Sequence, residues 1–306
     1  ISGAGDDSFR LTNLEFKGTY THCIRISGTS SGPGEGPYGL IDNCSMPSGG
    51  SFIFIRDNPG ANPNSWHRPM SFGTKKAIYI EDCTFIAPAG FAGGIADGDN
   101  GARYVLRHCN MVNMGTGSHG ADSQPAENGQ NPNKSILQIE MMHNSLTVDG
   151  RGMDMGIFIR GGTANIFDNE FKAVNGGYMN CAIKLAYYRA LAGNGVVAVD
   201  RVHPVDYLGT QQPGCGYVGK PGQDPRFPNE PWGSVPIYAW SNRHPAANGY
   251  LYGDPSGFMQ EKRDYFLSYD ESGKRPGYTE YTYPHPLRGI ASKVPAPKNL
   301  RIVSPQ

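Results

Sequence analysis

The sequence has no excess of either charge. Lysine and arginine together number 27, as do aspartate and glutamate, so the formal net charge at pH 7 is +0. Proteins that bind nucleic acid commonly carry a basic stripe or patch, because contacts to phosphates supply much of their affinity. No such stripe is visible here, so we expect no nucleic-acid partner.

Long hydrophobic runs are also missing. No apolar segment approaches the roughly 20 residues that a helix needs to cross a bilayer, so we expect no membrane span. The chain starts at Ile1, without a methionine or a signal sequence, and its first residues already read as a turn followed by a strand. We therefore expect a start that has been processed or truncated.

Motifs typical of metal or nucleotide sites are missing as well. The 6 cysteines form no Cys-x-x-Cys or Cys/His pattern. His203, His244 and His285 are scattered, and each adjoins a proline, which favours loop positions over a metal site. The sequence has no Gly-x-Ser-x-Gly elbow, P-loop or dinucleotide fingerprint, so we expect no nucleotide cofactor.

What the chain does contain is turn-forming residues and aromatics. Its 42 glycines and 24 prolines make up more than a fifth of the residues, without a collagen-like period. Aromatic residues account for 11%, which argues against disorder because their side chains supply buried area. With no helical period of 3.6 residues, this composition predicts many short strands joined by turns.

One corner motif recurs along the chain. A short apolar strand is followed by Asn or Asp, then Asn or Cys, one further residue and an apolar residue. The corner positions are Asn13, Cys44, Cys83, Cys109, Asn144 and Asn169, with a partial copy at Asn242. The first six are separated by 31, 39, 26, 35 and 25 residues, as expected of a solenoid whose coils keep their strands but vary one loop.

A second strand follows each corner, at 22–27, 51–57, 93–99, 118–123, 155–161 and 180–185. Two strands in each unit and short Gly-rich bends predict an all-β fold, a parallel β-helix whose coils stack at about 4.8 Å. Equivalent corner residues then form a ladder, in which neighbouring cysteines come within reach of a disulfide.

We expect one domain over residues 1–290. Its regular coils span about 10–185, a long loop excursion spans 186–235, and a last strand and an aromatic-rich cap span 236–290. An extended Pro-rich tail follows at 291–306. Twelve of the 17 tyrosines lie after residue 186, where they either cap the open end of the solenoid or form a stacking surface for sugar rings.

The second strands also define a candidate site. They are aligned on Ile24, Ile53, Ile95, Gly120, Ile157 and Ile183. Asp97 and Asp122 then share one position in adjacent coils, where other coils carry aliphatic residues. Stacked carboxylates repel each other unless a cation, a shared proton or a flanking arginine compensates. Residues of the same predicted patch are Arg56, Asp99, His119, Arg160 and Lys184.

These features resemble the right-handed parallel β-helix proteins of the pectate-lyase-like superfamily, over roughly Arg10 to Leu185. The resemblance implies a secreted, carbohydrate-active protein that cleaves or binds an acidic polysaccharide along the face of the second strands. As a lyase, it would hold Ca²⁺ through Asp97, Asp99 and Asp122, with Lys184 or Arg160 as the base.

As a glycoside hydrolase of this fold, it would use Asp97 and Asp122 as the carboxyl pair, assisted by His119. The run 117–120 followed by Ile183 and Lys184 partly resembles two polygalacturonase motifs. Ala182 stands where those proteins have arginine, and no Asn-Thr-Asp motif precedes it. Lyase and hydrolase chemistry both stay open.

Each candidate residue also has a purely structural interpretation. Asp97 and Asp99 suit an Asx-type turn, Asp122 and His119 suit a hydrogen-bonded bend, and Lys184 suits a solvated outward position. The alternative function is therefore a non-catalytic surface, adhesion or filament protein, which would self-associate through its coil ends.

Overall fold

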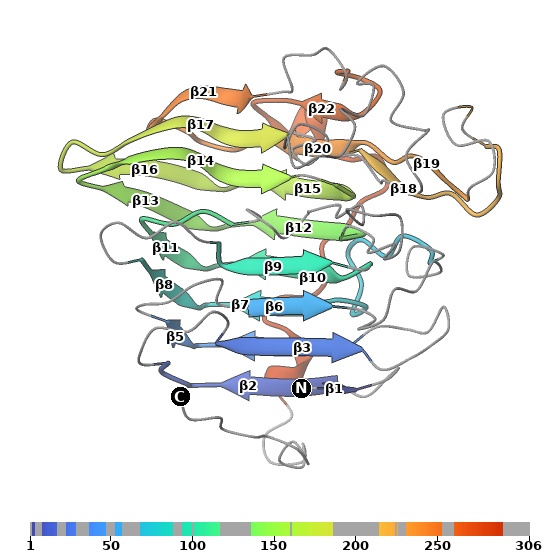
Figure 1. Cartoon of the computed structure of the whole chain (residues 1–306), viewed down its shortest axis with the longest axis horizontal. Helices are drawn as coiled ribbons and strands as arrows, with labels where there is room; N and C mark the ends of the chain where they lie inside the picture. The colour runs from blue at the N-terminus through green and yellow to red at the C-terminus, as the bar shows by residue number, and fades with distance from the viewer. Residues whose placement is uncertain are drawn as a thin grey trace, which may run out of the picture.

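The fold was analysed in a computed structural model of the chain. The structure describes residues 2–3, 8–16, 23–28, 37–46, 53–56, 68–87, 94–99, 101–116, 136–159, 161–185, 214–223, 225, 231–252 and 260–289. Within these ranges the chain forms strands, turns and two single-turn 3₁₀ helices, η4 (Glu271–Gly273) and η5 (Pro286–Arg288), and no α-helix (Figure 1). The predicted all-β class is confirmed.

Most strands belong to parallel sheets. The largest is an eight-stranded sheet of β2 (Ser8–Thr12), β4 (Tyr38–Asp42), β7 (Ile78–Glu81), β10 (Arg103–Arg107), β12 (Gln138–Met142), β15 (Thr163–Phe167), β20 (Ile237–Trp240) and β22 (Tyr265–Leu267). A five-stranded sheet contains β5 (Ser45–Met46), β8 (Thr84–Ile86), β11 (Asn110–Val112), β13 (Ser145–Asp149) and β16 (Glu170–Val174).

The second strands form two further parallel sheets. The four-stranded sheet contains β1 (Ser2–Gly3), β3 (Ile24–Gly28), β6 (Ile53–Arg56) and β9 (Ala96–Asp99). The three-stranded sheet contains β14 (Gly152–Ile159), β17 (Tyr178–Leu185) and β21 (Ala247–Tyr252). Isolated parallel bridges, Gly94 to Gly115 and Thr116 to Ile157, lie between these two sheets, which share one side of the molecule (Figure 1).

The chain visits the sheets in a repeating order. It runs from the eight-stranded sheet to the five-stranded sheet and then to a second-strand sheet, as β4, β5 and β6 do, followed by β7, β8 and β9. Each turn thus places its strands directly on those of the turn before (Figure 1). This arrangement is compatible with a β-helix. Its interior is a continuous apolar core that includes Ile26, Ile80, Leu106 and Ile166.

The corners after the strands of the eight-stranded sheet share one backbone conformation. The residue at each corner has a positive φ of 51° to 57°, which favours Asn, Asp and His over β-branched residues. These residues are Asn13, Asn43, Asp82, His108, His143, Asp168 and Ser241. Asn13 therefore belongs to this exposed row, and its predicted place in the buried ladder was wrong by one position.

The next residue at these corners forms the predicted ladder. Its members from the second coil onward are Cys44, Cys83, Cys109, Asn144, Asn169 and Asn242, all of them buried. Each side chain donates to a carbonyl of the preceding coil, as Cys83 does to Ile41 and Asn144 does to Leu106. All 6 cysteines are free, so no disulfide forms along the ladder.

Four of the described strands lie beyond the regular coils in positions that the sequence did not predict. In the predicted excursion, β18 (Cys215–Tyr217) and β19 (Trp232–Ser234) pair as an antiparallel hairpin. The strand β20 was expected to be the last, but two further strands follow it. β21 extends the three-stranded sheet and β22 extends the eight-stranded sheet, so the stack continues past residue 242.

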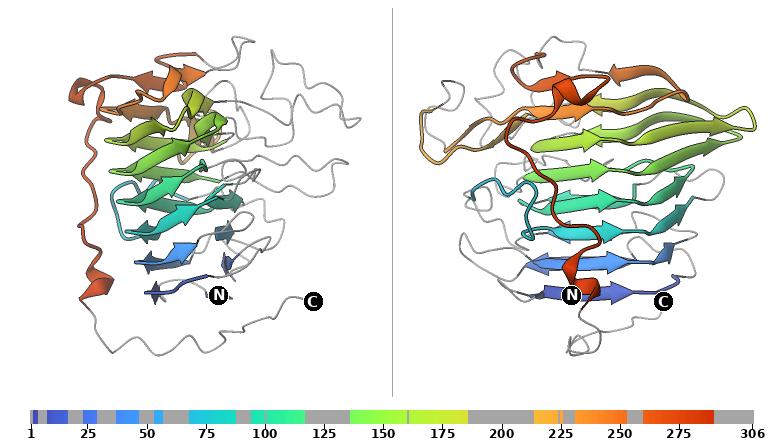
Figure 2. Two further views of the ribbon diagram at one scale, coloured as in Figure 1. Left: turned by 90° about the vertical axis from the view of Figure 1, so that its left-hand side faces the viewer. Right: turned by 180° about the vertical axis from the view of Figure 1, so that it is seen from behind.

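Residues 275–289, called the strap here, run back along the outer face of the eight-stranded sheet (Figure 2, right). Its Tyr278 and Tyr281 pack with Tyr79, Phe167 and other residues of that face. These tyrosines were expected either to cap the open end of the stack or to form a stacking surface for sugar rings. They cover the side of the stack instead, because the outer face of the sheet offers polar and aromatic partners along its length.

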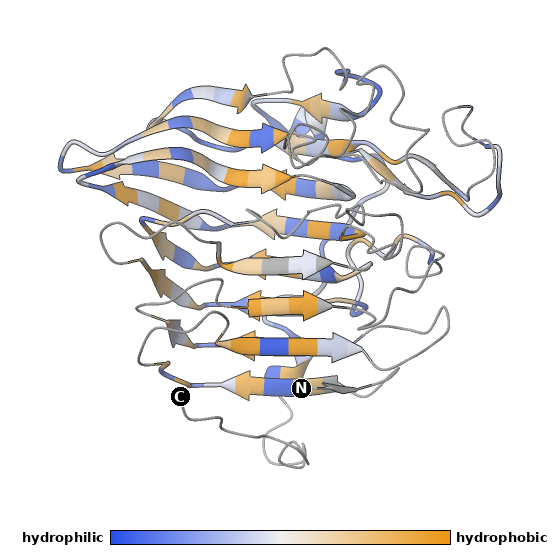
Figure 3. Ribbon diagram, viewed as in Figure 1, coloured by the Kyte–Doolittle hydropathy of each residue, from blue (hydrophilic) through white to orange (hydrophobic). Residues whose placement is uncertain are grey.

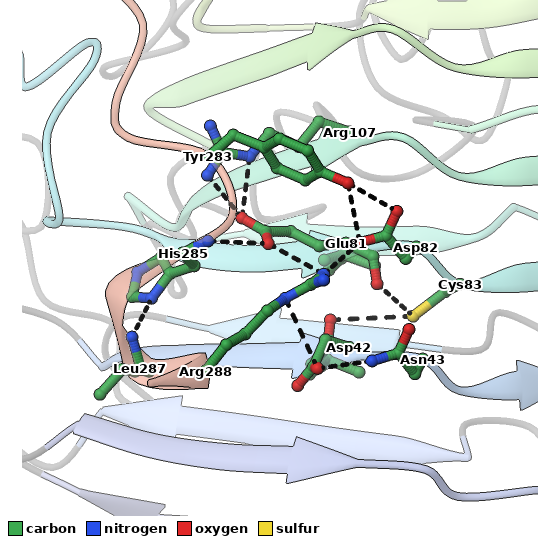
Figure 4. Close-up of polar contacts among 12 residues, drawn as sticks. Asp42, Asn43, Glu81, Asp82, Cys83, Arg107, Tyr283, His285, Leu287 and Arg288 are labelled. Atoms are coloured by element: carbon green, nitrogen blue, oxygen red, sulfur yellow. Dashed lines mark hydrogen bonds and ion pairs between the residues drawn. The ribbon is translucent and has the colours of Figure 1, made fainter. Parts of the chain in front are cut away.

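Buried charges hold the strap in place (Figure 4). The Arg107 guanidinium donates to Glu81 at 2.5 Å and 2.8 Å and to the carbonyls of Tyr281 and Thr282 at 2.6 Å and 2.7 Å. Glu81 in turn accepts from the backbone N–H of His285 at 3.2 Å. Arg107 and Glu81 are both fully buried, so the strap supplies the partners that water would otherwise supply.

Candidate functional site

The register of the second strands was predicted correctly at both ends of the stack. Ile24 pairs with Ile53 in the four-stranded sheet, and Ile157 pairs with Ile183 in the three-stranded sheet. In both places the core-facing residues are aliphatic, and one outward residue separates each from the next. The outward positions are therefore also as predicted, with Arg25 beside Phe54 and Phe158 beside Lys184.

The predicted register was wrong in the middle of the stack. Ile53 pairs with Ala96 and not with Ile95, because the chain bends at Ile95 and both residues are buried in the core. Every later residue of β9 is shifted by one position. Gly98 therefore pairs with the buried Ile55, and Asp97 pairs with Phe54. Asp97 thus occupies an outward position rather than replacing a core aliphatic residue.

The same shift relates Asp99 to a basic residue. Asp99 pairs with Arg56, which pairs with Ser27 in the coil before, so these three residues share a second outward position. The side chains of Asp97, Asp99 and Arg56 lie outside the described part of the structure. The register shows only that Asp97 pairs with Phe54 and Asp99 with Arg56.

Of the remaining candidate residues, only Lys184 lies in the part of the chain that the structure describes. His119, Asp122 and Arg160 lie outside the described residues. Within the described residues, Ile157 pairs with Thr116, and the segment 118–123 that was aligned with Ile157 lies outside them. Lys184 is described in full. Its Nζ lies 2.7 Å from Asp154 Oδ2 and 5.6 Å from the centre of the Phe158 ring.

Asp154 and Asn180 join Lys184 on the outer face of the three-stranded sheet. The Asn180 amide donates to Asp154 Oδ1 at 3.2 Å. The hydrogen bond from Lys184, followed by that from Asn180, lowers the pKa of Asp154, which stays ionised at neutral pH. Asp154 and Asn180 were not among the predicted site residues. Strict alternation from Ile157 and Ile183 would place both on the outer face, although only the register brings them together.

A second cation lies over an aromatic ring on the same face. The Arg25 guanidinium lies 5.4 Å from the centre of the Phe54 ring, and Arg25 is exposed. Arg25 and Lys184 thus repeat one arrangement, a cation on the ring of a neighbouring coil. The hydropathy colouring shows a polar position between apolar ones in β3 and in β17 (Figure 3).

Metal binding was expected at Asp97, Asp99 and Asp122. Within the described part of the chain, no group of three or more His, Cys, Asp or Glu side chains could hold a metal ion. The described side chains thus offer no donor set for Ca²⁺, and the expected ligands are those whose side chains the structure does not describe.

Among the described residues, no helix has both the length and the apolar character to cross a membrane. Comparison with protein-family models, with curated proteins and with solved structures gives no match to this chain. Its function must therefore be inferred from its own residues.

Proposed function

We propose that this chain is a secreted, right-handed parallel β-helix protein that binds an acidic polysaccharide on the outer face of its second strands and cleaves it as a lyase. The repeating order of the sheets supports the β-helix. The observation that carries the function is the group of Lys184, Asp154 and Phe158, in which a cation lies between a carboxylate and an aromatic ring.

That group suits a sugar that carries a carboxylate. Phe158 is buried, with 6% exposed, so its ring supports the Lys184 ammonium, and Lys184 and Asp154 are the polar groups that meet the sugar. An ammonium has three donors and no acceptor, so Lys184 is suited to bind the substrate carboxylate rather than to remove a proton. Arg25 over Phe54 supplies a second group of the same kind farther along the face.

In the proposed reaction, a base removes the proton from the carbon beside the carboxylate. The electron pair forms a carbon–carbon double bond, and the glycosidic oxygen leaves and takes up a proton. With Lys184 binding the carboxylate, Arg160 is the remaining base candidate of the family resemblance, and it would have to act from a deprotonated guanidine. A hydrolase would instead require a carboxyl pair, for which Asp97 and Asp122 are the candidates.

The alternative is a non-catalytic protein that assembles through its coil ends or its tyrosine-rich segment. One observation bears on it. Tyr278 and Tyr281 of the strap pack against the chain's own eight-stranded sheet. Those tyrosines are already used within the molecule, which leaves the coil ends as the surfaces for such assembly.

The proposal is tested with a panel of polygalacturonate, alginate and hyaluronate. Product formation is followed by absorbance at 235 nm for unsaturated sugars and by reducing-sugar release, with and without a chelator. Unsaturated products identify a lyase, reducing ends alone identify a hydrolase, and loss of activity with chelator supports the expected Ca²⁺. Binding without either product favours a non-catalytic role.

Lys184→Met should weaken polysaccharide binding about tenfold, because it removes the cation that meets the substrate carboxylate. Lys172→Met is a matched control, since Lys172 forms a similar exposed pair with Glu170 at 2.5 Å on the five-stranded sheet. Equal affinities of the two variants, or no binding to any member of the panel, would contradict the proposal.

A further inference from the structure

An exposed aromatic ring lies on the outer face of the three-stranded sheet, away from Lys184. Tyr178 begins β17 and pairs with Gly152 of β14. A Cβ atom at Gly152 would lie only 2.6 Å from Tyr178 Cζ and 2.7 Å from its hydroxyl oxygen. The ring therefore covers Gly152 closely, and 53% of Tyr178 is nevertheless exposed. The absence of a side chain at Gly152 is what lets the ring lie against the sheet.

A row of polar side chains lies beside this ring. Asp154 and Asn180 are two residues farther along β14 and β17, on the same side of the sheet and about 7 Å away along the strand. The register of β17 with β21 adds the exposed Asn248 in the next coil. Adjacent members are thus about 4.8 Å apart, a spacing comparable with the length of one sugar residue.

We propose that Tyr178, with Asp154 and Asn180, forms a binding subsite for one pyranose ring of the polysaccharide. The apolar face of the sugar packs on the exposed face of Tyr178, while its hydroxyls donate to Asp154 and accept from Asn180. This inference rests on the proposed function. It adds a stacking subsite at the start of β17, beyond the group that Lys184 forms.

The geometry also explains why both residues of the Gly152–Tyr178 pair matter. Tyr178→Ala removes the stacking surface but leaves the fold intact, because the side chain is largely exposed. Gly152→Ala introduces a methyl group where the ring now lies. The flexible side chain of Tyr178 must then swing away, since its far end is the part that meets the methyl group. Both changes remove the same surface by different means.

The test measures affinity for whichever of polygalacturonate, alginate and hyaluronate the wild-type protein binds, by titration calorimetry. Tyr178→Ala and Gly152→Ala should each weaken binding about tenfold, and Tyr178→Phe should stay within about twofold of wild type. Tyr269→Ala is the matched control, because Tyr269 is 74% exposed but lies outside the second-strand sheets. It should bind like wild type.

The possible results distinguish failure of the Tyr178 subsite from failure of the proposed function. If wild type binds and Lys184→Met weakens binding, but Tyr178→Ala and Gly152→Ala do not, the Tyr178 subsite is wrong and the proposed function stands. If Tyr269→Ala weakens binding as much as Tyr178→Ala, the effect is not specific to this site and the subsite is again overturned. If wild type binds none of the three polymers, both fall together.

Discussion

Asn169 has the richest set of hydrogen bonds in the corner ladder. Its amide donates to the carbonyls of Met141 and Phe167 at 3.0 Å and to the Asn242 side chain at 2.9 Å. Its carbonyl oxygen accepts from the backbone and the side chain of Asn144. Because only 3% of Asn169 is exposed, water cannot replace these partners.

Asn169→Ala should therefore lower the free energy of unfolding by about 3 kcal/mol, since it leaves buried carbonyl and amide groups unpaired in two neighbouring coils. Asn169→Cys should recover part of this loss, because cysteine occupies the same ladder position at Cys83 and Cys109 and donates to the preceding coil. Urea denaturation measures both. Asn175→Gly is the control, because Asn175 is exposed and glycine tolerates its positive φ of 50°, and it should change stability by less than about 1 kcal/mol.

At the level of elements, two stacked histidines connect the corner row to the strap. His108 stacks on Tyr283 of the strap with ring centres 3.7 Å apart, and on His143 at 4.9 Å. The Glu280 carboxylate accepts from His143 Nε2 at 3.1 Å, and that bond raises the pKa of His143. His108 behaves oppositely. Burial first and the neighbouring His143 second lower its pKa to about 4, against the opposing effect of Asp82.

The strap should consequently loosen in acid. The folded protein binds a proton at His108 more weakly than the unfolded chain does, so this contribution to stability falls as the pH drops below about 6.5 and levels off near pH 4. His108→Asn removes this titration, and asparagine tolerates the corner's positive φ of 55°. Between pH 6.5 and pH 4, the free energy of unfolding of wild type should therefore fall relative to that of the variant. A difference that stays constant from pH 7 to pH 4 would contradict the assignment.

The elements show what alternation can and cannot predict. Ile24, Ile53, Ile157 and Ile183 fall in strictly alternating strands, so their pairing and the outward position of Lys184 were predictable. At Ile95 the backbone bends and two successive residues enter the core, which no count of alternating residues reveals. The position of Asp97 was therefore wrong by one, so that it pairs with Phe54 and not with the core residue Ile55.

At the scale of the whole molecule, the strap spans coils that otherwise contact only their neighbours. Arg10 in the first strand of the eight-stranded sheet donates to the carbonyls of Leu287 and Arg288. Near the other end of that sheet, Arg275 donates to Asn165 at 2.6 Å. Nothing in the sequence predicts these contacts, because Arg107 and Tyr281 are 174 residues apart and share no periodic pattern.

In stacked-repeat proteins, stability is approximately a sum of repeat and nearest-neighbour terms, so distant coils can unfold separately. The strap adds contacts between distant coils and should make unfolding more cooperative. A chain ending at Lys274 should therefore melt about 10 °C lower than a control ending at Gly289, which keeps every described strap contact. The calorimetric transition of the chain ending at Lys274 should also broaden or split, because the strap no longer joins distant coils.

Hydrogen exchange distinguishes loss of cooperativity from simple destabilisation. In the control, amides of β4, β10 and β15 should exchange through one common opening. These three strands belong to the eight-stranded sheet, and the strap runs along the outer face of that sheet (Figure 2). In the shortened chain, the terminal coils should exchange faster than the central ones. A single sharp transition at an unchanged midpoint would show that the strap is a passive cover, and that the stack of parallel strands alone makes this molecule cooperative.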